Sequence, residues 1–331
     1  MTIDRDELNR VVVSAGFSGV VRVDRGDDVV LEVAFGDADR AHDVPNTATT
    51  QFGTASATKG LTALTVMRLV EEGVLSLATT ARSLLGADLP LIDDRVTVEH
   101  LLAHRSGIGD YLDEDLLDDI TEYVMPVPVH QLDTAESYLR VLDGFPMAFE
   151  PDSKFVYCNG GYVVLALLAE RAAGASYHDL VRDLVCRPAG LHDTVFLRSD
   201  ELPGRAAIGY LAASGLRTNV LHLPVVGCGD GGAYTTVSDL RTLWRALFAG
   251  AIVSLDTLTL MSSPHSTVSD RYACGLGFWL PVGGWVELDG GDAGVASWTR
   301  HHPERDETAT VLSNCSVGSD PVVRFIRESL A

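Results

Sequence analysis

Lysine is almost absent from this chain of 331 residues: of 25 basic side chains only Lys59 and Lys154 are amines, and the others are arginines. Arginine suits surface charge and ion pairs but keeps its proton, whereas a lysine in an apolar environment can lose its proton and act as a base. Lys59 follows a serine by three residues, in Ser56-Ala57-Thr58-Lys59. Such a pair arises by chance about once in a chain of this length, but a lysine kept where arginine would not serve favours a catalytic role.

Cysteine pairs and metal-binding patterns are missing as well. The five cysteines are odd in number, widely spaced and without a Cys-x-x-Cys pair, which argues against a disulfide framework and against a zinc cluster. No spacing of His, Asp and Glu indicates a metal site. We therefore expect reduced, mostly buried thiols and an activity that needs no cofactor and no metal. The cysteines are Cys158, Cys186, Cys228, Cys274 and Cys315.

Long apolar runs and a basic amino-terminal segment are also lacking. No stretch reaches the length of about 20 residues that spans a bilayer, and residues 1–6 have neither the positive charge nor the hydrophobic run of a secretory signal. We expect a cytoplasmic protein. The net charge of -21 opposes binding to nucleic-acid phosphates and to anionic membranes, so the expected partner is a small molecule.

The amino-terminal part predicts a hairpin and a buried helix. With 46% hydrophobic residues the chain can form a large core. Residues 20–23 and 29–33 are valine-rich runs on either side of an Asp/Gly turn, which predicts two paired strands. Residues 36–55 are predicted to be a loop. Over residues 56–72 the pattern is helical, with apolar side chains around most of the circumference before Gly73 ends it.

The rest of the chain completes an α+β fold. Residues 76–229 read as a mainly helical insertion with loops rich in Pro, Gly and Asp, followed by a helix over 236–248, four strands and a closing helix over 320–330. We predict one domain with a mainly antiparallel sheet built from both chain ends and flanked by helices. Its sheet lobe comprises 1–75 and 230–331, and its helical lobe 76–229. The helices predicted in the middle are 98–103, 135–142, 161–173 and 177–186, and the late strands are 275–280, 285–288, 296–301 and 308–313.

Five segments in a fixed order resemble those of one family. Their order and spacing are similar to those of the serine beta-lactamase-like superfamily, which includes class C beta-lactamases, D,D-peptidases, D-aminopeptidases and related esterases. The resemblance extends from about residue 15 to the end and implies a beta-lactamase/D,D-peptidase-like fold. The segments are Ser56 to Lys59, residues 101–108, Tyr157-Cys158-Asn159-Gly160-Gly161-Tyr162, Gly229-Asp230-Gly231-Gly232 before 236–240, and Gly290-Gly291-Asp292-Ala293-Gly294.

The resemblance implies a role for each site residue. Ser56 is the expected nucleophile, at a helix amino terminus whose dipole favours a developing negative charge. Lys59, shifted toward neutrality by burial, is the expected base. Tyr157 relays the proton to the leaving group, and Asn159 holds the lysine and the substrate carbonyl. The oxyanion hole joins the backbone N–H of Ser56 to that of Gly291.

Three conspicuous features are expected to lie outside the site. His104, in the second segment, is predicted to pack and to cap local structure. Lys154 is predicted to face solvent. The pair His301-His302, which precedes Pro303, reads as a solvated turn.

The start of the last of the five segments, with the two residues before it, corresponds to what is called the family's third motif and departs from the family pattern. An ungapped alignment through Gly291 puts Leu288-Asp289-Gly290 where the family carries Lys-Thr-Gly or His-x-Gly, so the cation is missing. In beta-lactamases and D,D-peptidases this strand end helps to bind the substrate carboxylate, which Leu288 cannot attract and Asp289 repels. We therefore expect both residues at the substrate and weak or no penicillin hydrolysis or D-Ala-D-Ala cleavage.

The sequence thus predicts a serine hydrolase of the esterase, amidase or aminopeptidase type. Its substrate is expected to be a neutral or amine-bearing ester or amide. An acyl-enzyme can also pass its acyl group to an alcohol or amine, so acyltransfer stays open. A binding protein that kept the fold and lost turnover is the third alternative, against which the intact Ser56, Lys59 and Tyr157 argue.

Overall fold

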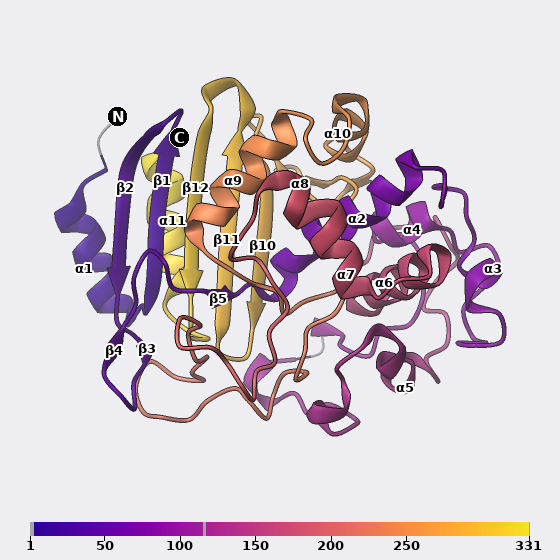
Figure 1. The fold of residues 1–331 in the computed structure, drawn as a ribbon, viewed down its shortest axis with the longest axis horizontal. Coiled ribbons are helices and arrows are strands. Elements are labelled where there is room, and N and C mark those ends of the chain that lie inside the picture. The colour runs from indigo at the N-terminus through magenta and orange to yellow at the C-terminus, as the bar shows by residue number, and fades with distance from the viewer. Residues whose placement is uncertain (1–2, 115–116, 331) are drawn as a thin grey trace.

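Eight antiparallel strands form one sheet at the centre of the computed structural model, which describes residues 3–114 and 117–330 (Figure 1). Their order is β2-β1-β12-β11-β10-β9-β8-β7. The amino-terminal hairpin thus pairs with the last strand, and the predicted sheet from both chain ends is confirmed. The strands are β1 (Gly19–Arg25), β2 (Asp28–Phe35), β7 (Ser266–Thr267), β8 (Tyr272–Cys274), β9 (Trp279–Pro281), β10 (Val286–Asp292), β11 (Val295–His302) and β12 (Glu307–Ser313).

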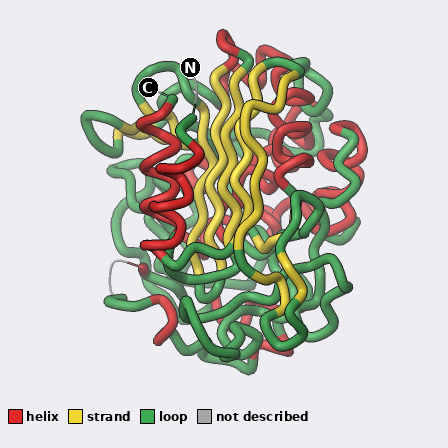
Figure 2. The backbone as a smooth tube through the Cα atoms, turned by 90° about the vertical axis from the view of Figure 1, so that its left-hand side faces the viewer, coloured by secondary structure: helices red, strands yellow, loops and turns green. Residues whose placement is uncertain are grey.

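Helices cover both faces of this sheet (Figure 2). On one face α1 and α11 pack against each other and bury Trp298 of β11. On the other face lies α9, where the Trp244 indole donates a hydrogen bond of 2.9 Å to the Thr299 hydroxyl. Successive side chains of a strand point to opposite faces, so β11 supplies both layers. These helices are α1 (Arg5–Ala15), α9 (Val237–Phe248) and α11 (Ser319–Ser329).

Helix α1 has no counterpart among the predicted elements. Asp4 caps it, because one carboxylate oxygen accepts two backbone N–H bonds of the first turn, each 3.0 Å long. Gly16, with φ of 67°, ends it in the left-handed conformation. Only Leu8 and Val12 of this helix are buried, so its apolar stripe is too narrow to stand out in the sequence.

Two buried helices, α2 (Thr58–Glu71) and α6 (Asn159–Ala173), pack against each other beside the sheet. The predicted helix over 56–72 is confirmed, with its start formed by a short 3-10 turn, η1 (Ala55–Ala57). The middle of the chain carries short helices and long loops around α6. Its other helices are α3 (Ala81–Leu85), α4 (Val98–Leu102), α5 (Leu139–Leu142), α7 (Tyr177–Val181) and α8 (Arg187–Ala189), and α10 (Leu255–Met261) follows α9.

The predicted loop over 36–55 contains three very short strands. β3 (Asp37–Asp39) pairs with β4 (Val44–Pro45), and β5 (Phe52–Gly53) pairs with β6 (Tyr234–Thr235). The second pair matters for the site, because it fixes the chain just before Ser56.

Two predictions near the carboxyl end are wrong. Residues 275–280 are not one strand, because the chain turns between β8 and β9 at Gly277, where φ is 89° and a Cβ would lie 2.2 Å from that of Ala63. His301 and His302 are not in a solvated turn but are buried at the end of β11. The His301 ring meets the Thr308 hydroxyl at 2.9 Å.

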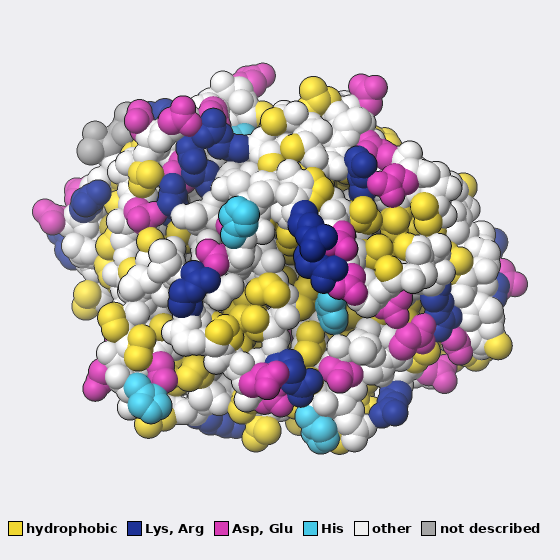
Figure 3. Space-filling view, viewed as in Figure 1, with side chains coloured by type: hydrophobic (Ala, Val, Ile, Leu, Met, Phe, Trp, Pro, Cys, Tyr) yellow, Lys and Arg dark blue, Asp and Glu magenta, His cyan; other side chains and the backbone are white. Residues whose placement is uncertain are grey.

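Other expectations agree with the structure. All five cysteines are free and buried, and Lys154 is exposed. Within residues 3–114 and 117–330, the helices fall short of the length and apolarity of a membrane span. On the face shown in Figure 3, basic side chains stand beside acidic ones, in keeping with ion pairs such as that of Arg171 with Glu136.

Candidate active site

Ser56 lies in η1, the turn that leads into α2. The preceding Ala55 has φ of 44°, a conformation that non-glycine residues rarely adopt and that is found at sites held by their surroundings. Strand β10 presses against this turn: a Cβ on Gly290 would lie 2.7 Å from the backbone nitrogen of Ser56. The glycine is therefore required, and the contact supports the ungapped alignment that puts Gly290 in the third motif.

Lys59 is buried behind the serine, with 4% of its surface exposed. Its Nζ lies 2.9 Å from the Ser56 Oγ, 2.7 Å from the Asn159 Oδ1 and 2.7 Å from the backbone oxygen of Asp230. Desolvation lowers the pKa of the ammonium, and the carboxylates of Asp230 and Glu114 oppose this effect. When the amine is neutral, its lone pair is within reach of the Ser56 hydroxyl proton.

Tyr157 forms the other side of the serine. Its ring centroid lies 4.9 Å from the Lys59 Nζ, and the ring is held between His104, at 4.6 Å, and Trp279, at 5.9 Å. Burial raises the pKa of Tyr157 well above its usual value, while an interaction with the Ser56 hydroxyl lowers it. At neutral pH the phenol therefore keeps its proton and can donate it.

His104 has a structural part in this arrangement, as predicted, but it also touches the site. Its Nδ1 accepts the backbone N–H of Cys158 at 3.1 Å, which fixes the chain between Tyr157 and α6. Burial, with the charge of Lys59, lowers the pKa of His104 to about 3, so the ring is neutral. It positions Tyr157 by packing.

Asn159, the first residue of α6, links three parts of the chain. Besides accepting the Lys59 ammonium, its amide donates hydrogen bonds to the backbone oxygen of Leu112, at 3.1 Å, and to the Glu114 carboxylate, at 2.9 Å. The carboxylate of Asp110 accepts the backbone N–H groups at the start of α6. The loop that precedes residue 115 is thereby tied to the lysine.

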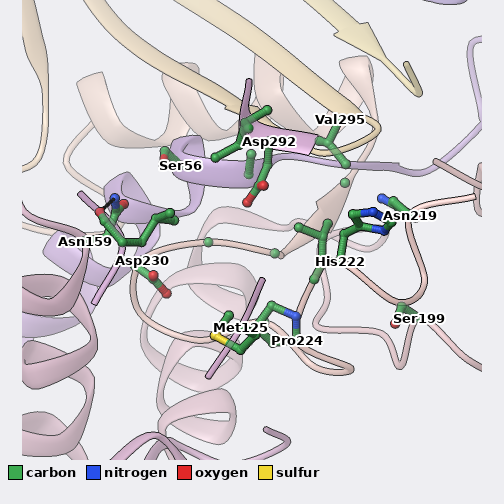
Figure 4. A pocket seen from close by; sticks show the side chains of 18 of the residues that line it. Ser56, Met125, Asn159, Ser199, Asn219, His222, Pro224, Asp230, Asp292 and Val295 are labelled. Carbon is green, nitrogen blue, oxygen red and sulfur yellow. Dashed lines mark hydrogen bonds between the residues drawn. The ribbon is translucent and has the colours of Figure 1, made fainter. Parts of the chain in front are cut away.

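Two cavities meet at Ser56. The inner pocket, of about 70 Å³, lies between β10 and the loops of the helical region (Figure 4). The outer cleft, of about 740 Å³, extends along β10 and β11 to α11. Both are lined by Ser56 and Gly291, whereas Tyr157 and Trp279 line only the outer cleft.

The lining of the inner pocket combines apolar side chains with three carboxylates. Among the described residues that line it, the carboxylates are Glu114, Asp230 and Asp292, and none is Lys or Arg. Burial raises the pKa of Asp292 to about 7; the N–H of Ala293 lowers it and the charges of Asp230 and Glu114 raise it further. Burial also raises the pKa of Asp230, against the opposing charge of Lys59. The Tyr111 hydroxyl donates a hydrogen bond to the Asp230 carboxylate.

The outer cleft carries charges of both signs. Asp289 of β10 is exposed in it, and Arg324 and Arg327 reach it from α11. The low-dielectric walls of the cleft raise the pKa of Asp289, and the charge of Arg327 opposes the rise.

Leu288, unlike Asp289, does not lie in the outer cleft. Only 4% of its surface is exposed, and its side chain fills the space above Gly60 of α2, where a Cβ would lie 2.6 Å from a Leu288 methyl. The side chains of Leu288 and Asp289 point to opposite sides of β10. Among the sequence-predicted residues, Ser56, Tyr157, Asn159, Gly291 and Asp289 line one or both cavities. Lys59 lines neither but contacts Ser56 and Asn159 from behind them, and Leu288 lies in the core and lines neither.

Residue types alone did not reveal two groups that belong to the site. Asp230 contacts Lys59 through its backbone oxygen, which any residue carries. Asp292 lies within a segment that the sequence singled out for its glycines, and only the fold shows that its carboxylate lines both cavities.

Comparisons with known proteins agree with this geometry. A model of the Beta-lactamase family matches residues 8–330. Penicillin-binding protein 4* of Bacillus subtilis is 28% identical over 319 residues, covering 90% of this chain and 68% of that protein. Esterase EstB of Burkholderia gladioli is 34% identical over 197 residues, covering 58% and 49%. A solved structure, a penicillin binding protein from Bacillus halodurans, matches with a TM-score of 0.91 at 32% identity, covering 98% and 100%. The resemblance drawn from the motifs is confirmed.

Proposed function

The chain belongs to the Beta-lactamase family, and we propose that it hydrolyses an ester or an amide through a covalent acyl-enzyme on Ser56. The observation that carries this proposal is the Lys59 amine, 2.9 Å from the Ser56 Oγ and desolvated toward neutrality. The similarity to an esterase supports this class of chemistry. Family membership gives the class, a serine hydrolase, and the substrate is our proposal.

The site residues have defined tasks in the proposed acylation step. Lys59 takes the proton of the Ser56 hydroxyl while the Oγ attacks the substrate carbonyl carbon. The backbone N–H groups of Ser56 and Gly291, with the positive end of α2, stabilise the oxyanion. Tyr157 gives its proton to the leaving group as the bond to the carbonyl breaks, and the Lys59 ammonium restores the phenol. Water then attacks the acyl-enzyme and releases the acid.

The two cavities hold different parts of the substrate in this proposal. The leaving group takes its proton from Tyr157, which lines only the outer cleft, so the leaving group occupies that cleft. The acyl group then occupies the inner pocket, which has no Lys or Arg among its described lining residues. A carboxylate on the acyl group would be desolvated there beside Asp292 and Glu114 without a partner, and the pocket therefore disfavours it.

A fluorophosphonate probe is expected to label Ser56 covalently, and Ser56→Ala is expected to abolish the labelling. The reason is that the desolvated Lys59 amine lies 2.9 Å from the Ser56 Oγ and that Ser56 stands at the amino terminus of α2, whose dipole favours a negative charge. Intact-mass analysis and peptide mapping check the result, with Ser76→Ala, an exposed serine beyond α2, as the control. An adduct on another serine, with Ser56→Ala still reactive, would contradict the mechanism. Labelling followed by no turnover of any ester would favour the binding-protein alternative.

Nitrocefin and benzylpenicillin are expected to be poor substrates, with kcat/KM at least about tenfold below that of a short p-nitrophenyl ester. The reason is that the third motif carries Leu288 in the core and Asp289 in the cleft. Asp289→Asn should narrow the gap by removing the repulsion, whereas Asp270→Asn, an exposed carboxylate in the loop after β7, should not. If nitrocefin were hydrolysed as fast as the best ester, another group, such as Arg324, would be holding the carboxylate.

Acyl transfer is the second candidate, favoured by the size of the outer cleft. At about 740 Å³ it has room for an alcohol in place of the departed leaving group. The ratio of ester to acid formed from one acyl donor, measured with increasing methanol or glycerol, distinguishes transfer from hydrolysis. A ratio no greater than that of the uncatalysed reaction would exclude transfer to these alcohols.

A further inference from the structure

The inner pocket contains three carboxylates to which the mechanism gives no task, those of Glu114, Asp230 and Asp292, and in the described part of the chain only the last lacks a hydrogen bond from another side chain. Asp292 stands on β10 immediately after Gly291, and its carboxylate points into the pocket in Figure 4. One of its oxygens accepts the backbone N–H of Ala293 at 2.7 Å. Within the part of the chain that the structure describes, no Lys or Arg forms an ion pair with it.

The other acids near the serine already have partners. The Asp230 carboxylate accepts the Tyr111 hydroxyl, and the Glu114 carboxylate accepts the Asn159 amide at 2.9 Å. The carboxylate of Asp110 accepts the first N–H groups of α6. Among these acids, Asp292 is the one whose described hydrogen bond comes only from the backbone N–H of the next residue, Ala293.

We propose that Asp292 binds the ammonium group of an amine-bearing acyl group and thereby sets the substrate preference of this enzyme. The proposal rests on the proposed function, because it assigns the acyl group to the inner pocket. It makes the preferred substrate an amide or ester of an amino acid, or of a similar acid with an amine close to its carbonyl.

The position of Asp292 in the strand limits where that amine can be. Gly291, whose N–H is assigned to the substrate oxygen, is the neighbouring residue, and successive Cα atoms are about 3.8 Å apart. An ammonium in contact with the Asp292 carboxylate would lie near the substrate carbonyl, and for this reason we assign it to an amine close to the carbonyl carbon. The rest of the pocket fits an apolar side chain, since Met125, Leu197 and Val225 line it.

The charge of the site agrees with this assignment. Burial raises the pKa of Asp292 to about 7, Glu114 and Asp230 raise it further, and Lys59 lowers it. Among the described residues that line the pocket, the only His, Lys or Arg is His222, whose pKa is lowered by burial. A bound ammonium would compensate the crowded carboxylates, which no described Lys or Arg of the pocket lining does.

The proposal has a pH dependence with a definite sign. Below about pH 7 the Asp292 carboxyl is protonated and neutral, and above it the carboxylate can pair with an ammonium. The value of kcat/KM for an amine-bearing substrate should therefore rise through about pH 7. It should fall again where the substrate amine loses its proton, near the usual α-amino pKa of about 8.

The test compares substrates that differ only in the amine. Wild type and Asp292→Asn are assayed with the p-nitroanilides of alanine, leucine and phenylalanine, each in both enantiomers. The same two proteins are assayed with the p-nitroanilides of the corresponding carboxylic acids that lack the amine. We expect wild type to prefer the amine-bearing members by about tenfold or more in kcat/KM, and Asp292→Asn to lose that preference through a raised KM. Asp270→Asn, with the same charge change at an exposed site away from the pocket, should behave as wild type.

Separate readouts keep this proposal distinct from the proposed function. Hydrolysis of p-nitrophenyl 3-phenylpropionate and labelling by the fluorophosphonate report the acyl-enzyme alone, and melting temperature reports the fold of Asp292→Asn. Equal preference for amine-bearing and amine-free substrates in wild type, with ester hydrolysis intact, would overturn the role of Asp292. An unchanged preference in folded Asp292→Asn would do the same. Failure of both labelling and ester hydrolysis would overturn the proposed function itself.

Discussion

Lys59→Arg is expected to lose activity almost as completely as Lys59→Ala, by about 10²–10⁴ in kcat. The substitution keeps the positive charge and a comparable length, so a role as a mere cation would survive it. A guanidinium, however, stays protonated and cannot accept the Ser56 proton. The variant therefore separates the base function of the amine from its charge.

The surroundings of Lys59 make this loss specific. The amine reaches three oxygen atoms, on Ser56, Asn159 and Asp230, at 2.7–2.9 Å, from a buried position. Lys154→Arg is the matched control, because the only other lysine is exposed and should tolerate the change. If Lys59→Arg, with a normal melting temperature, kept more than about a tenth of wild-type kcat, another group would be the base.

Gly290→Ala is expected to damage both stability and catalysis. A Cβ at this position would lie 2.4 Å from the backbone oxygen of Thr54 and 2.7 Å from the backbone nitrogens of Ser56 and Ala57. Backbone atoms cannot turn aside as a side chain can, so β10 or the nucleophile turn must move. Overpacking of this kind costs about 1–3 kcal/mol, and a displacement of about 1 Å at the nucleophile can reduce kcat about 10²-fold.

The neighbouring glycine supplies the control for this prediction. A Cβ on Gly291 would meet no atom within 4 Å, so Gly291→Ala should leave the melting temperature nearly unchanged, although its methyl enters the cleft. Thermal unfolding and the rate of fluorophosphonate labelling measure the two effects. A Gly290→Ala protein as stable and as reactive as wild type would show that β10 does not hold the turn of Ser56.

The sequence predicted those parts of the fold that depend on local pattern or on recurring segments. The hairpin of β1 and β2 has two valine-rich runs around a turn, and α2 and α6 are apolar around most of their circumference. Helix α1 was not predicted because only two of its side chains are buried, which is too few for a helical apolar pattern in the sequence. Its stability depends on those two contacts and on the cap at Asp4. Residues 275–280 have a strand-like composition, but close packing of Gly277 against α2 imposes a turn.

The same distinction holds for the site. Motif order identified Ser56, Lys59 and Tyr157 as candidates, and the fold brings them together. The direction of a side chain on β10 depends on strand register, so the sequence could not show that Leu288 enters the core while Asp289 faces the cleft. The contact of Lys59 with Asp230 uses a backbone oxygen, which every residue type carries, so the sequence could not indicate it.

The pairing of β1 with β12 has a consequence for how this protein is made. The Ser18 hydroxyl donates a hydrogen bond to the side chain of Asn314, 296 residues away, beside that strand pair. During synthesis the hairpin of β1 and β2 leaves the ribosome first and must wait with an unpaired edge until β12 follows. Such distant pairing slows folding, and a waiting strand edge favours aggregation. Because Gly291 also arrives late, a nascent chain that already carries Ser56 and Lys59 is expected to stay unreactive until the last strands emerge.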